Sequence, residues 1–80
     1  MIRFTFLFIL VYSVMQLTIN GQQQNFDSPM DIQQLIEKLL LHNKRIAIEY
    51  NGKIIPRSHF SKTMLEEGDQ LEIIVAVGGG

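Results

Sequence analysis

The 80-residue sequence contains no cysteine, no tryptophan and only two prolines, and its charge is nearly balanced. The absence of cysteine excludes a disulfide framework, a thiolate zinc site and a cysteine nucleophile, and it fits a reducing, cytoplasmic location. Seven basic and eight acidic residues give a formal net charge of −1. No basic stripe is available to neutralise phosphates, so we expect no nucleic-acid partner. A chain of this length forms at most one small domain.

Apolar residues are concentrated in the first fourteen positions, MIRFTFLFILVYSV. This run is shorter than the roughly 20 apolar residues that span a bilayer, so we expect no membrane partner. The segment also has features of a signal peptide, with Arg3 before the apolar run and small Ser13 near its end. An A-x-A-like cleavage site is absent, however. We favour a third interpretation, in which Met15 is the true start, residues 1–14 are an apolar extension outside the fold, and the domain covers residues 15–77.

Two Asn-Gly pairs, at residues 20–21 and 51–52, predict β-hairpins, because a type I′ turn needs positive φ at both central residues. The first hairpin, MQLTINGQQQNF, joins residues 15–19 to a polar edge strand, 22–26, and the second joins 46–50 to 53–55. The final strand, 70–77, alternates polar and apolar residues at first and becomes apolar on both faces. We therefore expect its far end to be buried on both sides, in the centre of the sheet.

One helix is expected from SPMDIQQLIEKLLLHN, residues 28–43. Ser28 is the expected N-cap, Pro29 the first helical residue and Asp31 the partner in a capping box. The apolar stripe consists of Ile32, Leu35, Ile36 and Leu39. The expected complements of the helix dipole are His42, Lys44 and Arg45. The segment after the second hairpin is expected to be irregular, with Phe60 and Leu65 as core anchors.

The resulting order, β-β-α-β-β-β, predicts an α+β fold: a mixed four- to five-stranded sheet with one main helix packed on one face. This is the β-grasp plan, in which the first and last strands lie side by side in the middle of the sheet.

Catalytic and metal-binding candidates are few. His42 and His59 are the only histidines, and without a nearby carboxylate cluster we expect both to be surface residues that hold no metal. The acidic run at residues 66–69 is expected to be a solvated turn around Gly68. No phosphate-binding loop is expected, since the terminal glycines precede no helix. We expect neither a catalytic residue nor a bound cofactor.

The sequence ends on Gly78, Gly79 and Gly80, directly after the last expected strand. Three extended residues reach about 10 Å, and glycine lacks the side chain that would keep such a tail out of a narrow active site. A carboxylate is a poor electrophile, so adenylation by another enzyme would be needed to activate Gly80. The alternative is a frayed end with no function.

Three stretches of the sequence carry a resemblance to a known family: MQLTINGQ, EYNGKIIPRSHF and LEEGDQLEIIVAVGGG. These stretches resemble ThiS, a family of ubiquitin-like β-grasp sulfur carriers. The shared features are the opening strand, the N-G turn, the P-R pair with a following aromatic residue, the G-D turn and the glycine tail. The resemblance covers residues 15–80, and residues 1–14 have no counterpart in it.

The resemblance implies a carrier in the biosynthesis of the thiazole moiety of thiamine. A ThiF-like enzyme would use ATP to adenylate the carboxylate of Gly80, and a sulfur donor protein would convert the adenylate to a thiocarboxylate. A ThiG-like thiazole synthase would then accept the sulfur. Gly78 and Gly79 would form a flexible tail that enters the partner's active site. The candidate docking residues are Ile74, Ala76 and Val77, with core packing as the alternative.

Other functions remain open on the sequence alone. The chain could carry sulfur for molybdopterin synthesis or tRNA thiolation, although those relatives lack the NGKIIPRSHF signature. It could also be a ubiquitin-like modifier that is conjugated to lysines through Gly80. A secreted or membrane-anchored protein is suggested only by residues 1–14. In each carrier interpretation the chain is acted on by enzymes and is not itself one.

Overall fold

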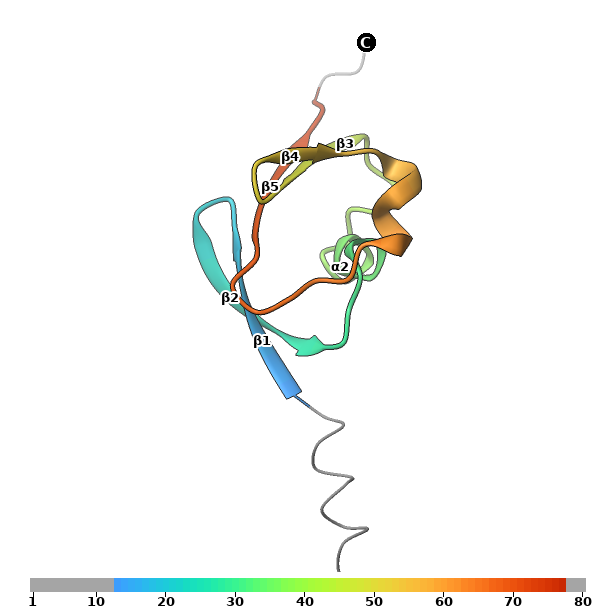
Figure 1. Cartoon of the computed structure of the whole chain (residues 1–80). Coiled ribbons are helices and arrows are strands. Elements are labelled where there is room, and N and C mark those ends of the chain that lie inside the picture. The colour runs from blue at the N-terminus through green and yellow to red at the C-terminus, as the bar shows by residue number, and fades with distance from the viewer. Residues whose placement is uncertain (1–12, 78–80) are drawn as a thin grey trace, which may run out of the picture.

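The computed structural model describes residues 13–77, which form one five-stranded mixed sheet and two short helices (Figure 1). The strands are β1 (Ser13–Ile19), β2 (Gln22–Ser28), β3 (Ile46–Tyr50), β4 (Lys53–Ile55) and β5 (Gln70–Val75). The helices are α2 (Ile32–Lys38) and the 3-10 helix η1 (Arg57–Lys62). The strand order is β2-β1-β5-β3-β4, and β1 and β5 are parallel. The predicted β-grasp arrangement, with first and last strands adjacent in the middle, is confirmed.

Both Asn-Gly turns adopt the predicted backbone conformation. Asn20 and Gly21 have φ values of 51° and 83°, and Asn51 and Gly52 have φ values of 48° and 88°. Positive φ at both central residues is the requirement of a type I′ turn. Each turn sets the register of its hairpin, so that Ile19 pairs with Gln22 and Tyr50 pairs with Lys53.

Both strands of the first hairpin are longer than the sequence predicts, at the end away from the turn. Ser13 pairs with Ser28 and Val14 pairs with Asp27. Two residues assigned to the apolar extension therefore belong to the sheet, and β2 continues past Phe26. The reason is that the two-residue turn aligns both strands in register, and the ladder continues for as long as both remain extended. Residues 1–12 lie outside the described part of the chain.

The helix begins three residues later than predicted, because Ser28 is taken by the β1–β2 ladder. Asp31 is the N-cap: its Oδ1 accepts a 2.7 Å hydrogen bond from the backbone N–H of Gln34. The Gln34 side chain accepts in return from the N–H of Asp31 at 2.9 Å. This reciprocal pair is a capping box, with Asp31 as its first member rather than its last.

The helix also ends early, at Lys38, and closes through Leu40, whose φ is 62°. The N–H of Leu41 donates to the carbonyl of Ile36 at 2.8 Å, and that of Leu40 donates to Glu37 at 3.0 Å. These two bonds form a Schellman motif with leucine at the left-handed position. His42, Lys44 and Arg45, the expected complements of the helix dipole, follow this closure, and the basic residue of the last helical turn is Lys38.

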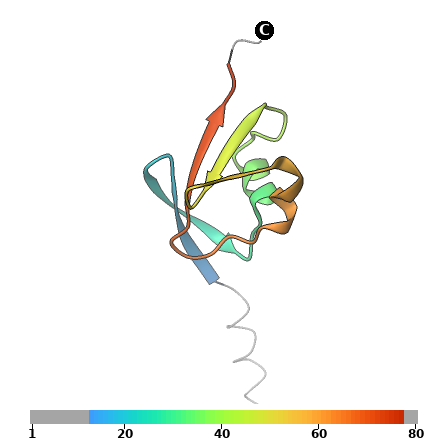
Figure 2. The same cartoon turned by 45° about the horizontal axis from the view of Figure 1, so that its top comes forward.

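The core lies between the sheet and one layer formed by α2 and η1, which pack on the same side of the sheet (Figure 2). Helix α2 buries Ile32, Leu35 and Ile36, and the predicted anchors Phe60 and Leu65 are also buried. The sheet contributes Met15, Leu17, Ile19, Phe26, Ile48, Leu71 and Ile73. One layer can cover only one face of a sheet, so no other element of residues 13–77 covers the opposite face, here called the free face. Within residues 13–77 no helix has the length and apolarity needed to cross a membrane.

Candidate functional site

Strand β5 carries the chain toward its C-terminal end, and its position depends on side chains as well as on the sheet ladder. It pairs with β1 only at Thr18–Gln70 and Ile19–Leu71. Beyond that point the side chain of Asn20 takes the place of the missing strand. Its Oδ1 accepts from the N–H of Ile73 at 2.7 Å, and its Nδ2 donates to the carbonyl of Ile73 at 3.2 Å. Asn20 is therefore both a central residue of the β1–β2 turn and a hydrogen-bonding anchor for β5.

The start of β5 is held by a polar cluster around Asp69, which is 8% exposed. The Asp69 carboxylate accepts from the Tyr50 hydroxyl at 2.6 Å, from the Asn51 amide at 3.1 Å and from the backbone N–H of Glu66 at 2.7 Å. Asn51 in turn accepts from the N–H of Gln70 at 2.8 Å. The expectation of a solvated turn is therefore wrong for Asp69, which joins the β3–β4 turn to β5.

Burial, followed by the hydrogen bond to Asp69 and the charges of Asp69 and Glu66, raises the pKa of Tyr50 to about 12. A partly buried hydroxyl that donates to a carboxylate resists ionisation, because the phenolate would place a second negative charge beside the first. Tyr50 therefore acts as a hydrogen-bond donor throughout the physiological pH range.

Past β5 the chain leaves the sheet. The N–H of Ala76 donates to the carbonyl of Arg45 at 2.8 Å, and the next residue, Val77, is 92% exposed. The predicted tail of Gly78, Gly79 and modified Gly80 lies outside the described residues, so its role stays a prediction. What the structure defines is the root of that tail: strand β5, which ends at Val75, followed by exposed Val77.

The three predicted docking residues are all exposed, which excludes the core-packing alternative for Ile74, Ala76 and Val77. Ile74 is 59% exposed, so β5 is central in the sheet but buried on one face only, contrary to the expectation. Its neighbour across the ladder is exposed Ala47, and exposed Ile54 lies on the next strand, β4. We call these five residues the apolar surface. Their docking role stays a prediction.

Two acidic residues border the apolar surface on the side away from the tail. Glu49 and Glu72 lie directly opposite each other on β3 and β5, and Ile54 lies opposite Glu49 on β4. His42 and His59 are exposed, as expected. Within the described part of the chain there is no group of three or more histidine or acidic residues that could hold a metal ion.

Sequence reasoning missed Asn20 as an anchor of β5 and Ile54 as a part of the apolar surface. The signal for Ile54 was present: successive side chains of a strand alternate between faces, so one of the two isoleucines of Lys53–Ile55 had to face outward. Asn20 had no such signal, because its second role needs a strand 53 residues away.

A β-grasp sheet whose last, central strand ends at an exposed apolar surface is the arrangement of a ubiquitin-like protein. Within that class, the chain belongs to the ThiS family, whose model matches residues 15–80. It is also similar to the crystal structure of the thiamine biosynthesis protein ThiS from Geobacter metallireducens, with a TM-score of 0.70 and 29% identity. That match covers 82% of this chain and 100% of the other.

Among curated proteins, the chain is 36% identical over 66 residues to a thiazole synthase of Paramagnetospirillum magneticum. The match covers 82% of this chain but only 20% of the synthase, so the chain corresponds to about a fifth of that protein. It is 40% identical over 62 residues to the uncharacterized protein ycf40 of Porphyra purpurea, covering 78% of this chain and 87% of the other. It is 26% identical over 66 residues to the sulfur carrier protein ThiS of Escherichia coli, covering 82% and 100%.

Proposed function

We propose that this chain is a sulfur carrier in the formation of the thiazole moiety of thiamine. The observation that carries the proposal is the combination of ThiS family membership over residues 15–80 with a last strand that ends at Val75 and is followed by exposed Val77, three residues before Gly80. Two relatives support the same role: the Escherichia coli protein is named a sulfur carrier, and the Paramagnetospirillum protein is named a thiazole synthase.

The proposed reaction sequence uses the carboxylate of Gly80. A ThiF-like enzyme binds ATP, the carboxylate oxygen attacks the α-phosphorus, and pyrophosphate leaves, which yields an acyl adenylate. A sulfur donor protein then supplies sulfur at the oxidation level of sulfide, which attacks the acyl carbon. The bond to AMP breaks, AMP leaves, and a thiocarboxylate remains. A ThiG-like thiazole synthase transfers that sulfur to its substrate, the C–S bond of the carrier breaks, and an oxygen atom from water or from the sulfur acceptor restores the carboxylate.

The chain itself supplies presentation rather than catalysis. Gly78 and Gly79 form a tail without side chains, which suits entry into a narrow active site. The ATP is held by the adenylating enzyme, and the carrier binds no cofactor. The partners that must reach Gly80 also meet Ile74, Ala76 and Val77 at the tail's root. We place the reaction in the cytoplasm, a proposal that fits the cysteine-free sequence.

Mass spectrometry tests the proposal directly. The chain is incubated with ATP, an adenylating enzyme of the ThiF type and a sulfur donor, and the C-terminal peptide is sequenced. We expect one oxygen of Gly80 to be replaced by sulfur, and we expect a chain that lacks Gly80 to remain unmodified while folding normally. An unmodified wild-type peptide, in a reaction that modifies a known carrier, would refute the proposal. Conjugates to lysine would indicate a protein modifier instead.

The docking role of the apolar surface is tested by Ile74→Gln, with Val14→Gln as the matched control. Both side chains are 59% exposed, and both lie on the free face of the sheet, at its opposite ends. Ile74→Gln is expected to raise the KM for the carrier in adenylation with little change in the free energy of unfolding. Val14→Gln is expected to change neither quantity. Equal effects of the two variants would show that position on the sheet is irrelevant.

A further inference from the structure

The loop between α2 and β3 borders an open hollow of about 390 Å³. Its lining consists of His42, Asn43, Lys44, Arg45, Ile46 and Arg57. Lys44, Arg45 and Arg57, which we call the cationic corner, are three of the seven lysine and arginine residues in the whole chain. None of the described residues that line the hollow is acidic. A chain with a net charge of −1 thus carries a local positive potential at one point of its surface.

The corner is fixed by the fold. The Nη2 of Arg57 donates to the carbonyl of Lys44 at 3.0 Å, and its guanidinium lies 5.5 Å from the ring centroid of buried Phe60. Arg57 therefore ties the loop to η1 and gains from the cation–π contact. The side chains of Lys44 and Arg45 are exposed and make no ion pair within residues 13–77. Their charges are available to a partner.

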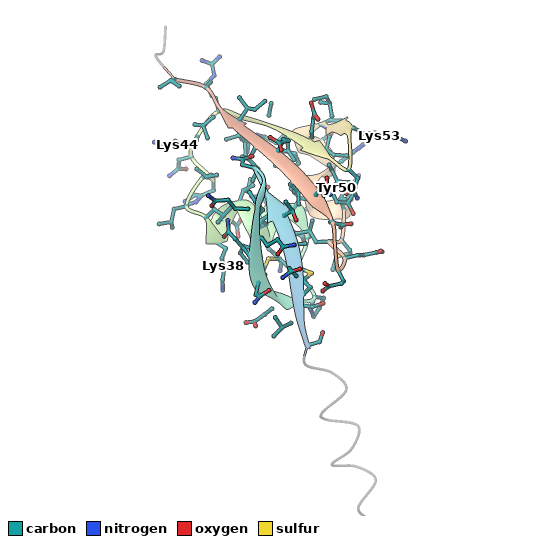
Figure 3. All side chains as sticks on the ribbon, turned by 90° about the vertical axis from the view of Figure 1, so that its left-hand side faces the viewer. Lys38, Lys44, Tyr50 and Lys53 are labelled. Carbon is teal, nitrogen blue, oxygen red and sulfur yellow. The ribbon has the colours of Figure 1, made fainter. Side chains whose placement is uncertain are left out.

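The corner also lies at the root of the tail. The carbonyl of Arg45 accepts from the N–H of Ala76, and Ile46 pairs with Val75. Figure 3 shows Lys44 on the side of the domain toward which β5 runs, with Lys53 on the opposite side. The tail after Val77 reaches about 10 Å at most, which is close to the screening length of about 8 Å at physiological ionic strength. Any enzyme that acts on Gly80 must bring its surface close to this corner.

We propose that the cationic corner docks against carboxylate side chains on the surface of the adenylating enzyme, an inference that rests on the proposed function. Because the corner lies at the root of the tail, it comes close to the surface of the adenylating enzyme when Gly80 enters the active site. The reaction takes place at Gly80, about a tail's length beyond Val77. The corner therefore faces the rim of the enzyme's entrance, where protein carboxylates rather than nucleotide phosphates are its counterpart.

The test compares two double variants of the full chain with the same change in charge. Lys44→Glu with Arg45→Glu reverses the corner, and Lys38→Glu with Lys53→Glu reverses two exposed lysines elsewhere (Figure 3). Pyrophosphate release by the adenylating enzyme gives kcat and the KM for the carrier. We expect the corner variant to raise this KM at least about tenfold at low salt, with kcat unchanged, since steering acts on encounter. Added salt should shrink the difference.

Each alternative explanation predicts a different outcome of this experiment. Lys44→Arg with Arg45→Lys keeps the charges and is expected to retain the wild-type KM. Equal effects of the corner and control variants would overturn the inference, because net charge alone would then explain them. A change confined to the KM for ATP, or to sulfur transfer by the thiazole synthase, would also overturn it. A wild-type chain that is not adenylated at all would refute the proposed function, and the inference with it. Far-UV circular dichroism checks that each variant is folded.

Discussion

The hydroxyl of Tyr50 donates a 2.6 Å hydrogen bond to Asp69, and Tyr50→Phe removes that bond while keeping the ring. A hydrogen bond to a charged group contributes roughly 1.5–3 kcal/mol. Tyr50 is partly exposed, and Asp69 keeps its bonds from Asn51 and Glu66. We therefore expect the variant to lose about 1–2 kcal/mol of unfolding free energy at neutral pH, or about 4–8 °C in Tm for each kcal/mol.

The same bond has a definite pH dependence. Burial first, and then Asp69 and Glu66, raise the pKa of Tyr50 from 10.0 to about 12. A group whose pKa is higher in the folded state contributes stability that is complete below the unfolded value. The contribution is therefore intact below pH 10 and is lost as the pH rises from 10 to 12. A two-unit shift corresponds to about 2.7 kcal/mol, and partial exposure reduces it to about 1–2 kcal/mol.

Urea unfolding, followed by far-UV circular dichroism, measures the difference between wild type and Tyr50→Phe across this range. We expect the difference to narrow between pH 10 and 12. The chain has two tyrosines, so the variant retains only Tyr12, and the difference in tyrosinate absorbance isolates the titration of Tyr50. A difference below about 0.5 kcal/mol at neutral pH, the range of ordinary surface changes, would refute the reasoning. So would a difference that stays constant up to pH 12.

Urea unfolding also checks three further changes. Leu35→Ala, at a fully buried position, is expected to cost about 2–5 kcal/mol, and a change near that of exposed Val14→Ala would contradict the core described above. Gly52→Ala should cost about 1–2 kcal/mol from its φ of 88° alone, since nothing lies within 4 Å of the new Cβ; an unchanged stability would show that the turn relaxes. Leu40→Gly should stabilise the domain by about 1 kcal/mol, because Leu40 is 74% exposed with φ 62°. A destabilised variant would mean that the Leu40 side chain has a packing role.

The features predicted correctly are those set by neighbouring residues. The Asn-Gly turns need only their own backbone preference, and the stripe of α2 needs only helical spacing. The start of α2 shows the limit of such rules. Ser28 and Asp31 both satisfy the local rule for an N-cap. The choice between them depends on the pairing of Ser28 with Ser13, fifteen residues earlier in the chain. A rule based on neighbouring residues cannot predict that pairing.

Some features of the candidate site follow from the sequence alone, and others depend on the tertiary structure. By itself, the sequence determined that an apolar strand is followed by three glycines, and that no cysteine is present to carry sulfur elsewhere in the chain. The tertiary structure decided which apolar side chains remain outside. Ile74 and Ile73 are equally apolar, and only the position of the single helical layer buries one and exposes the other. It also decided that Asp69 is buried and that Arg57, Lys44 and Arg45 meet at the root of the tail. Burial and charge clustering depend on contacts between distant segments, and those exist only once the chain is folded.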